Sequence, residues 1–129
     1  MIEEGVRELA QAPNFAVYTS ISARGLPMSI ITWVDCDDEF ILINTEVHRR
    51  NFRNVTADPR IGVLIMDRND PEHYASVEGW LAGTVTGPAA KDHIEMLAQK
   101  YMGTPYDAEI RSERVILQIS PKRQRVRRP

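Results

Sequence analysis

The strongest constraint on this chain is the alternation of apolar and polar side chains near its start. In residues 15–22 every second side chain shares one face, which is the period of a β-strand. A short turn containing Gly25 follows, and then a second apolar run at 28–34. Because glycine adopts a positive φ without steric cost, the two runs are predicted to pair as an antiparallel hairpin.

Four more apolar runs predict strands, and three amphipathic segments predict short helices. Gly79 and Gly83 interrupt the longest predicted strand, which indicates a bulge or a barrel corner. We therefore predict a mainly β fold, a six-stranded antiparallel split β-barrel with short capping helices. The further strands are predicted at 40–45, 61–66, 74–86 and 115–119, and the helices at 2–11, at 48–57 and from 88 to the capping Gly103.

The length of 129 residues fits one domain, and no internal repeat or low-complexity linker divides it. Hydrophobic residues make up 43% and charged residues 26%, so the chain is expected to fold rather than remain disordered. A barrel of this size leaves little room for a deep pocket. A large ligand would therefore need an interface shared between subunits.

The basic residues are unevenly distributed. The formal net charge is −2, but the segment 121–129 is strongly basic and the rest of the chain is acidic. We expect this tail to be flexible and to dock on the acidic body. We do not expect nucleic acid as a partner, because no aromatic residues are interleaved with the charges. The basic residues of the tail are Lys122, Arg123, Arg125, Arg127 and Arg128.

Cysteine and hydropathy patterns predict a cytoplasmic location. Cys36 is the only cysteine, so the chain forms no internal disulfide and has no Cys-rich metal site. The three histidines are far apart in the sequence, and no metal site is expected. No apolar run approaches the roughly 18 residues of a membrane span, and the N-terminal segment is acidic.

Familiar catalytic motifs are absent, but one segment suits an anion. The chain has no Gly-x-Ser-x-Gly, no His-Glu-x-x-His and no glycine-rich phosphate loop. In residues 44–54 a buried strand ends in polar side chains and runs into a helix that carries Arg49, Arg50 and Arg53. Helix N–H groups and guanidinium forks both bind phosphate oxygens. The alternative interpretation is a solvated helix face.

Short motifs follow one another in order over most of the chain. They include Phe-Ala-Val-Tyr-Thr at 15–19, Gly-Leu-Pro at 25–27, Ile-Thr-Trp-Val-Asp at 31–35, Leu-Ile-Asn-Thr at 42–45, Arg-Asn-Val at 53–55 and Asp-Pro-Arg-Ile at 58–61. This order resembles the flavin- and deazaflavin-dependent split β-barrel oxidoreductases related to pyridoxamine 5′-phosphate oxidase. The F420-dependent actinobacterial branch is the most similar.

The resemblance implies a homodimer with its cofactor in a groove at the subunit interface. It places the cofactor phosphate on Arg49, Asn51, Arg53 and Asn54, with Arg50 beside them. Trp33 is expected at the ring, although packing under the dimer contact is an equal alternative for it. The residues expected along the ring and the ribityl chain are Met28, Ser29, Thr32, Trp33, Asn44 and Thr45.

One position departs from the family pattern. The second basic position of the phosphate-binding run is usually lysine, and here it is Asn51. Three outcomes follow from this loss of a charge. Arg50 replaces the lysine from the neighbouring position, or the cofactor binds weakly, or the barrel has lost its cofactor.

The predicted function is a coenzyme F420-dependent oxidoreductase that transfers a hydride between the deazaflavin and a small unsaturated substrate. No side chain need act as a catalyst, because the cofactor ring carries the chemistry. Tyr74 and Tyr101 would be proton donors only if they faced the groove. The alternatives are an FMN-binding flavoprotein similar to pyridoxamine 5′-phosphate oxidase and a non-catalytic barrel that binds flavin or haem. The loops at 68–74 and 102–113 carry no specificity motif that names the substrate.

Overall fold

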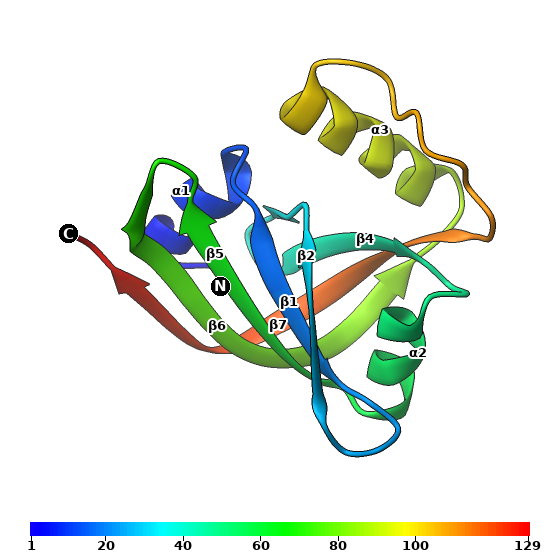
Figure 1. Ribbon diagram of the computed structural model, residues 1–129, viewed down its shortest axis with the longest axis horizontal. Coiled ribbons are helices and arrows are strands. Elements are labelled where there is room, and N and C mark those ends of the chain that lie inside the picture. Colours follow the sequence, from blue (N-terminus) through cyan, green and yellow to red (C-terminus); the bar gives the residue numbers. More distant parts are fainter.

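A single seven-stranded antiparallel sheet forms the framework of the computed structural model, which describes all 129 residues (Figure 1). Three helices lie against this sheet, α1 at one end and α2 and α3 toward the other. The helices are α1 (Glu4–Gln11), α2 (Arg50–Ala57) and α3 (Pro88–Met102). In spatial order the strands are β2 (Pro27–Thr32), β1 (Ala16–Ile21), β5 (Arg60–Asp67), β6 (Asp70–Val85), β7 (Arg114–Arg127), β4 (Ile41–Glu46) and β3 (Asp35–Cys36).

The mainly β, antiparallel architecture is confirmed, but two details differ from the six-stranded barrel. The sheet is open, with β2 and β3 as its edge strands. The additional strand is the two-residue β3, where Asp35 pairs with Leu42 and Cys36 with Ile41. The acidic residues around it read as a turn, and a two-residue strand has no alternation that a pattern could reveal.

The predicted alternation determines which face of the sheet is buried. In β1 the side chains of Ala16, Tyr18 and Ser20 are buried, and in β5 those of Ile61 and Ile65 are buried opposite them. The apolar side of α1 packs into the same core cluster. None of the three helices has the length and the hydrophobicity that a membrane-spanning helix needs.

The glycines of β6 mark two irregularities, as predicted. The register between β6 and β7 shifts at Glu78/Gly79 and again at Leu81/Gly83. A Cβ on Gly79 would clash with the backbone oxygen of Ser120, so only glycine permits this close approach of the two strands.

The prediction that order ends at Pro121 is wrong. Strand β7 continues to Arg127 and pairs with β6 from Gly79 back to Tyr74. Pro121 lies at the first register shift, where a missing N–H is tolerated. The side chain of Gln124 also ties this segment to the N-terminus through the backbone of Met1 and Glu3. The basic tail is therefore a strand of the sheet.

Candidate functional site

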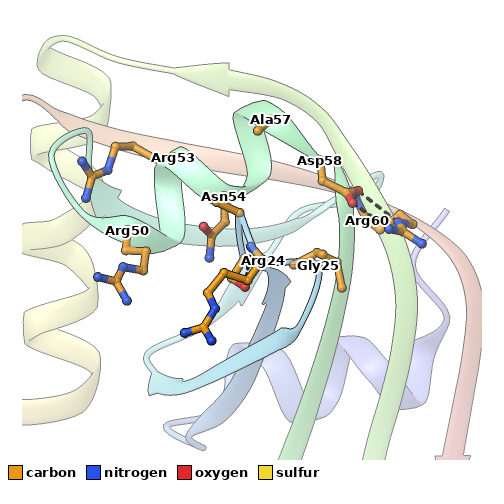
Figure 2. Close-up of a pocket in the computed structure, with 11 residues that line it drawn as sticks. Arg24, Gly25, Arg50, Arg53, Asn54, Ala57, Asp58 and Arg60 are labelled. Atoms are coloured by element: carbon orange, nitrogen blue, oxygen red, sulfur yellow. Dashed lines mark hydrogen bonds and ion pairs between the residues drawn. The ribbon is translucent and has the colours of Figure 1, made fainter.

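Two hollows lie on either side of the start of α2. The first, which we call the arginine groove, has a volume of about 810 Å³ and lies between the β1–β2 turn and α2 (Figure 2). The second, the aromatic pocket, has a volume of about 250 Å³ and lies between the end of β2, β4 and α3.

The residues predicted for a site divide between these hollows. Arg50, Arg53 and Asn54 line the arginine groove. Thr32, Trp33, Asn44 and Arg49 line the aromatic pocket. Neither hollow is lined by Met28, Ser29, Thr45 or Asn51.

The arginine groove holds more positive charge than its own carboxylate can balance. Arg60 is engaged by Asp58 through two hydrogen bonds of 3.0 and 2.7 Å, and these bonds lower the pKa of Asp58. Arg24, Arg50 and Arg53 make no ion pair. In Figure 2 the guanidinium groups of Arg24 and Arg50 lie on one side of the groove, whereas Arg60 turns to Asp58 at the other. Guanidinium groups without an ion-pair partner can bind an anion.

Arg24 is the residue of this groove that sequence reasoning missed. It lies in the turn between β1 and β2, far from the basic helix in the sequence, and only the antiparallel hairpin brings it to α2. The N-cap residue of α2, Arg49, makes no side-chain bond to the first turn of the helix.

Asn51 and Asn54 point into the fold. The Thr45 hydroxyl donates to Oδ1 of Asn51 over 2.9 Å, and the Tyr18 hydroxyl donates to the Asn51 backbone oxygen over 3.0 Å. Asn54 Nδ2 donates to Ser20 over 3.0 Å, although this residue also borders the groove. These bonds attach α2 to β1 and β4, so Asn51 positions the helix that carries the arginines.

Met28 and Ser29 occupy opposite faces of β2. The Met28 sulfur lies 3.8 Å from Nδ2 of Asn54, beneath α2. The Ser29 hydroxyl shares a 2.8 Å hydrogen bond with Thr19 on the outer face of the sheet. Met28 therefore contacts the arginine groove only through Asn54, and Ser29 is exposed on the opposite face of β2.

Aromatic side chains form one wall of the aromatic pocket. The Trp33 ring stacks on Tyr101 at 5.1 Å between centroids and meets Tyr106 edge-on at 6.2 Å. The Tyr101 hydroxyl donates to the backbone oxygen of Asn14 and accepts from the N–H of Val34, while burial raises the Tyr101 pKa to about 12. Tyr101 therefore holds the wall in place rather than supplying a proton.

A buried charge cluster underlies the same pocket. Glu46 is 1% exposed and accepts hydrogen bonds from the N–H groups of Arg111 and Ser112, each at 2.7 Å, and from Arg49 at 3.0 Å. Burial alone would raise the Glu46 pKa, but these bonds and the charges of Arg49 and Arg114 together lower it. The carboxylate is held ionised inside the fold.

Arg114 is a second residue that the sequence did not reveal. It begins β7, and the register places it opposite Glu46 of β4. Its Nε donates to Oδ1 of Asn44 over 2.9 Å, and its guanidinium lies over the Tyr106 ring at 5.4 Å. The sequence shows only an arginine at the start of an apolar strand. That Arg114 lies opposite Glu46 follows from the pairing of β4 with β7.

The amide of Asn44 is fully engaged by its surroundings. Its Nδ2 donates to the backbone oxygen of Ala90 over 2.9 Å and to Nδ1 of His93 over 3.0 Å. His93 in turn contacts Asp35 through Nε2 at 3.2 Å. Asn44 thus links β4, α3 and β7 and fixes the floor of the aromatic pocket.

Comparison with protein families identifies the family to which the chain belongs. The family model described as pyridoxamine 5′-phosphate oxidase matches residues 2–127. The chain belongs to this family. The resemblance inferred from the order of its motifs is therefore confirmed. A search of curated proteins finds no match.

Solved structures of the pyridoxamine 5′-phosphate oxidase fold extend the comparison. A structure called an F420 reductase superposes with a TM-score of 0.82 at 22% identity, covering 96% of this chain and 98% of the other. A conserved hypothetical protein from Mycobacterium tuberculosis gives 0.77 at 23% identity, over 98% and 84% of the two chains. A putative pyridoxamine 5′-phosphate oxidase from Listeria innocua gives 0.66 at 18%, over 92% and 90%. At these identities the likeness concerns the fold.

Proposed function

We propose that this protein is a coenzyme F420-dependent oxidoreductase that acts on a small unsaturated substrate. The observation that carries the proposal is the arginine groove, which is lined by Arg24, Arg50 and Arg53, none of which makes an ion pair. Phosphate groups suit this donor set, because guanidinium forks bind phosphate oxygens. Membership of a flavin-type oxidoreductase family supports the choice of cofactor class.

The residues present fit the phosphate end of such a cofactor despite Asn51. The lysine of the family pattern is absent, but Arg24 and Arg50 supply positive charge at the same groove. The side-chain oxygen of Asn51 accepts a hydrogen bond from Thr45, and its backbone oxygen accepts one from the Tyr18 hydroxyl. Of the three outcomes of this departure, the proposal adopts replacement of the lysine by Arg50, which lines the arginine groove and makes no ion pair.

The protein contributes binding and orientation rather than a catalytic side chain. Reduced F420 would supply a hydride when bound, and a proton from solvent would complete the two-electron reduction. Arg50 and Arg53 would hold the phosphate end, and Thr32 and Trp33 border the aromatic pocket. The buried Asn44 holds this floor rigid through Arg114 and His93.

A cofactor titration tests the proposal. Tryptophan fluorescence of the purified protein is followed as F420 or FMN is added, with Arg50→Ala and Arg53→Ala measured beside it. We expect F420 to bind more tightly than FMN, and each variant to lose about tenfold or more in affinity, which corresponds to about 1.4 kcal/mol. Arg111→Ala is the control, because Arg111 is exposed and its guanidinium contacts only Glu109. Tighter binding of FMN would change the cofactor, and binding of neither would reject the proposal.

A homodimer completes the proposed site. On the outer face of the sheet Ile31, Val17 and Leu64 form a row across β2, β1 and β5, and Ile31 is 74% exposed. Met66 extends this apolar strip along β5. A continuous apolar face of this kind is typical of a protein interface. Its occupant in this proposal is a second copy of the chain, which would enclose the cofactor from the other side.

The dimer is tested by light scattering on purified protein. Leu64→Arg should convert a dimer to a monomer, because the charge would be buried against the partner. Met96→Arg is the matched control, since Met96 is an exposed apolar residue on α3, away from the strip. A monomeric wild type, or a dimer that survives Leu64→Arg, would contradict the proposed interface.

A further inference from the structure

The turn between β1 and β2, which carries Arg24, is closed by its own hydrogen bonds. The Gly25 N–H donates to the backbone oxygen of Ser22 over 2.9 Å, and the Ser22 N–H donates to the backbone oxygen of Leu26 over 2.8 Å. The Ser22 hydroxyl accepts two longer bonds, from the N–H groups of Arg24 at 3.3 Å and Leu26 at 3.4 Å. Gly25 completes the turn with a φ of 77°, which other residues rarely adopt. The backbone of Arg24 therefore has a fixed place at the edge of the arginine groove.

The opposite wall of the groove is fixed as well. Nδ2 of Asn54 donates to the Ser20 hydroxyl over 3.0 Å, which attaches α2 to the strand that leads into the turn. Arg50 and Arg53 are three residues apart on this helix, so they are neighbours on its surface. Arg24 lines the groove from the turn, and Arg50 and Arg53 line it from α2 (Figure 2). Fixed walls lower the entropy that is lost when one ligand contacts both of them.

The groove has more positive charge than a single phosphate can balance. Asp58 is the one carboxylate among the residues that line it, and Asp58 is bonded to Arg60. The guanidinium groups of Arg24, Arg50 and Arg53 are exposed and make no ion pair. A phosphate monoester carries a charge of about −1.5 to −2 at pH 7. One bound phosphate would therefore leave at least one of the three guanidinium charges without a partner.

The size of the groove agrees with its charge. Its volume of about 810 Å³ lies in the upper part of the range of about 300 to 1,000 Å³ that small-molecule sites occupy. The groove is therefore large enough for a ligand that reaches from α2 to the turn.

We propose that the arginine groove binds a ligand with two anionic groups, one held by Arg50 and Arg53 and the other by Arg24. The proposal rests on the proposed function for the first group, which is the cofactor phosphate. It adds a second anionic group, a phosphate or a carboxylate, on the same ligand. In this role Arg24 determines specificity, because it favours a ligand that spans the groove over one that ends at a single phosphate.

The experiment compares three probes by calorimetric titration of the cofactor-free protein. Methyl phosphate has one anionic group, whereas pyrophosphate and phosphoglycolate link a phosphate to a second phosphate or to a carboxylate. We expect at least one of the two linked probes to bind about tenfold or more tightly than methyl phosphate, because it gains charge-assisted hydrogen bonds to Arg24. The tighter of the two identifies the second group as a phosphate or a carboxylate.

Variants assign this preference to Arg24. Arg24→Gln should remove it and leave the affinity for methyl phosphate within about twofold, because Arg50 and Arg53 remain. Lys91→Gln is the matched control: it removes one exposed, unpaired positive charge from α3, and Lys91 lines neither hollow. This control should keep the preference.

Several results would overturn the proposal. They are equal binding of the three probes, no binding of either linked probe, or a preference that survives Arg24→Gln. Loss of the preference in Lys91→Gln would also overturn it, because the effect would then follow from net charge. Failure of the proposed function is read separately, since the titration contains no cofactor. F420 binding that depends on Arg50 and Arg53 would stand even if Arg24 had no effect on the linked probes.

Discussion

The arginine groove and the aromatic pocket both contain arginines, but they hold them in opposite ways. Arg50 and Arg53 are exposed on α2 and make no ion pair, whereas Arg114 is buried against Glu46 and Asn44. An exposed guanidinium is solvated and contributes little to folding. A buried one is part of the packing, so its removal affects stability. The same residue type is therefore free to bind a ligand in one hollow and supports the fold in the other.

Removal of the buried carboxylate should give the largest effect on stability. Glu46→Gln leaves the buried Arg114 without its counter-charge and with the partly exposed Arg49 beside it, and we expect a loss of about 3 to 5 kcal/mol in the free energy of unfolding. Denaturant unfolding measures it. Glu109→Gln is the control, because its pair with Arg111 is exposed and should contribute less than about 1 kcal/mol. Equal losses of stability in the two variants would contradict the claim that the buried ion pair of Glu46 supports the fold more than an exposed pair does.

Lowering the pH should also destabilise the fold, because it protonates the buried and partly buried carboxylates around the aromatic pocket. The pKa of Glu46 and that of Asp35 are both lowered in the folded protein, so each contributes stability above the unfolded carboxyl pKa of about 4 and loses it as the pH falls through the folded value. Thermal unfolding from pH 7 to pH 3 should show a steep loss for the wild type. The loss should be shallower in Asp35→Asn, which removes one of these carboxylates. An unchanged profile would mean that Asp35 does not contribute to the acid sensitivity.

The smallest effect on stability is expected in the arginine groove. Arg50→Ala and Arg53→Ala should change the free energy of unfolding by no more than about 0.5 kcal/mol, since both side chains are exposed and unpaired. The same variants should lose cofactor affinity in the titration described above. Chemical unfolding without cofactor checks this separation. A stability loss of several kcal/mol would show that these arginines also support the fold.

Patterns in the sequence predicted much of the framework. The alternation of residues 15–22, the Gly25 turn and the apolar runs gave the antiparallel sheet, because one buried face imposes a period of two on every strand. Gly103 was expected to end a helix, and it does so with a φ of 72°. The two-residue β3 and the continuation of β7 past Pro121 were not predicted, since neither has an apolar alternation of its own.

The candidate site was only partly visible in the sequence. The basic run at 49–53 indicated an anion site because three arginines are close in sequence on one short helix. Arg24 and Arg114 were missed, as each reaches its hollow through strand pairing with residues far away in the chain. The burial of Asn51 was also hidden, because the direction of a polar side chain on a short helix depends on what packs against it.

By itself the sequence determined the local periods, the turns, the family motifs and the presence of a basic helix, all of which are short-range properties of neighbouring residues. Only the tertiary structure decided that the basic tail is a strand and that Glu46 faces Arg114 across the β4–β7 pairing. It also decided which arginine side chains are exposed to solvent and which are buried. The physical reason is twofold. Strand register brings together residues that are distant in the sequence. Burial changes the free energy of a charged side chain, and the sequence does not show whether a charged residue is buried.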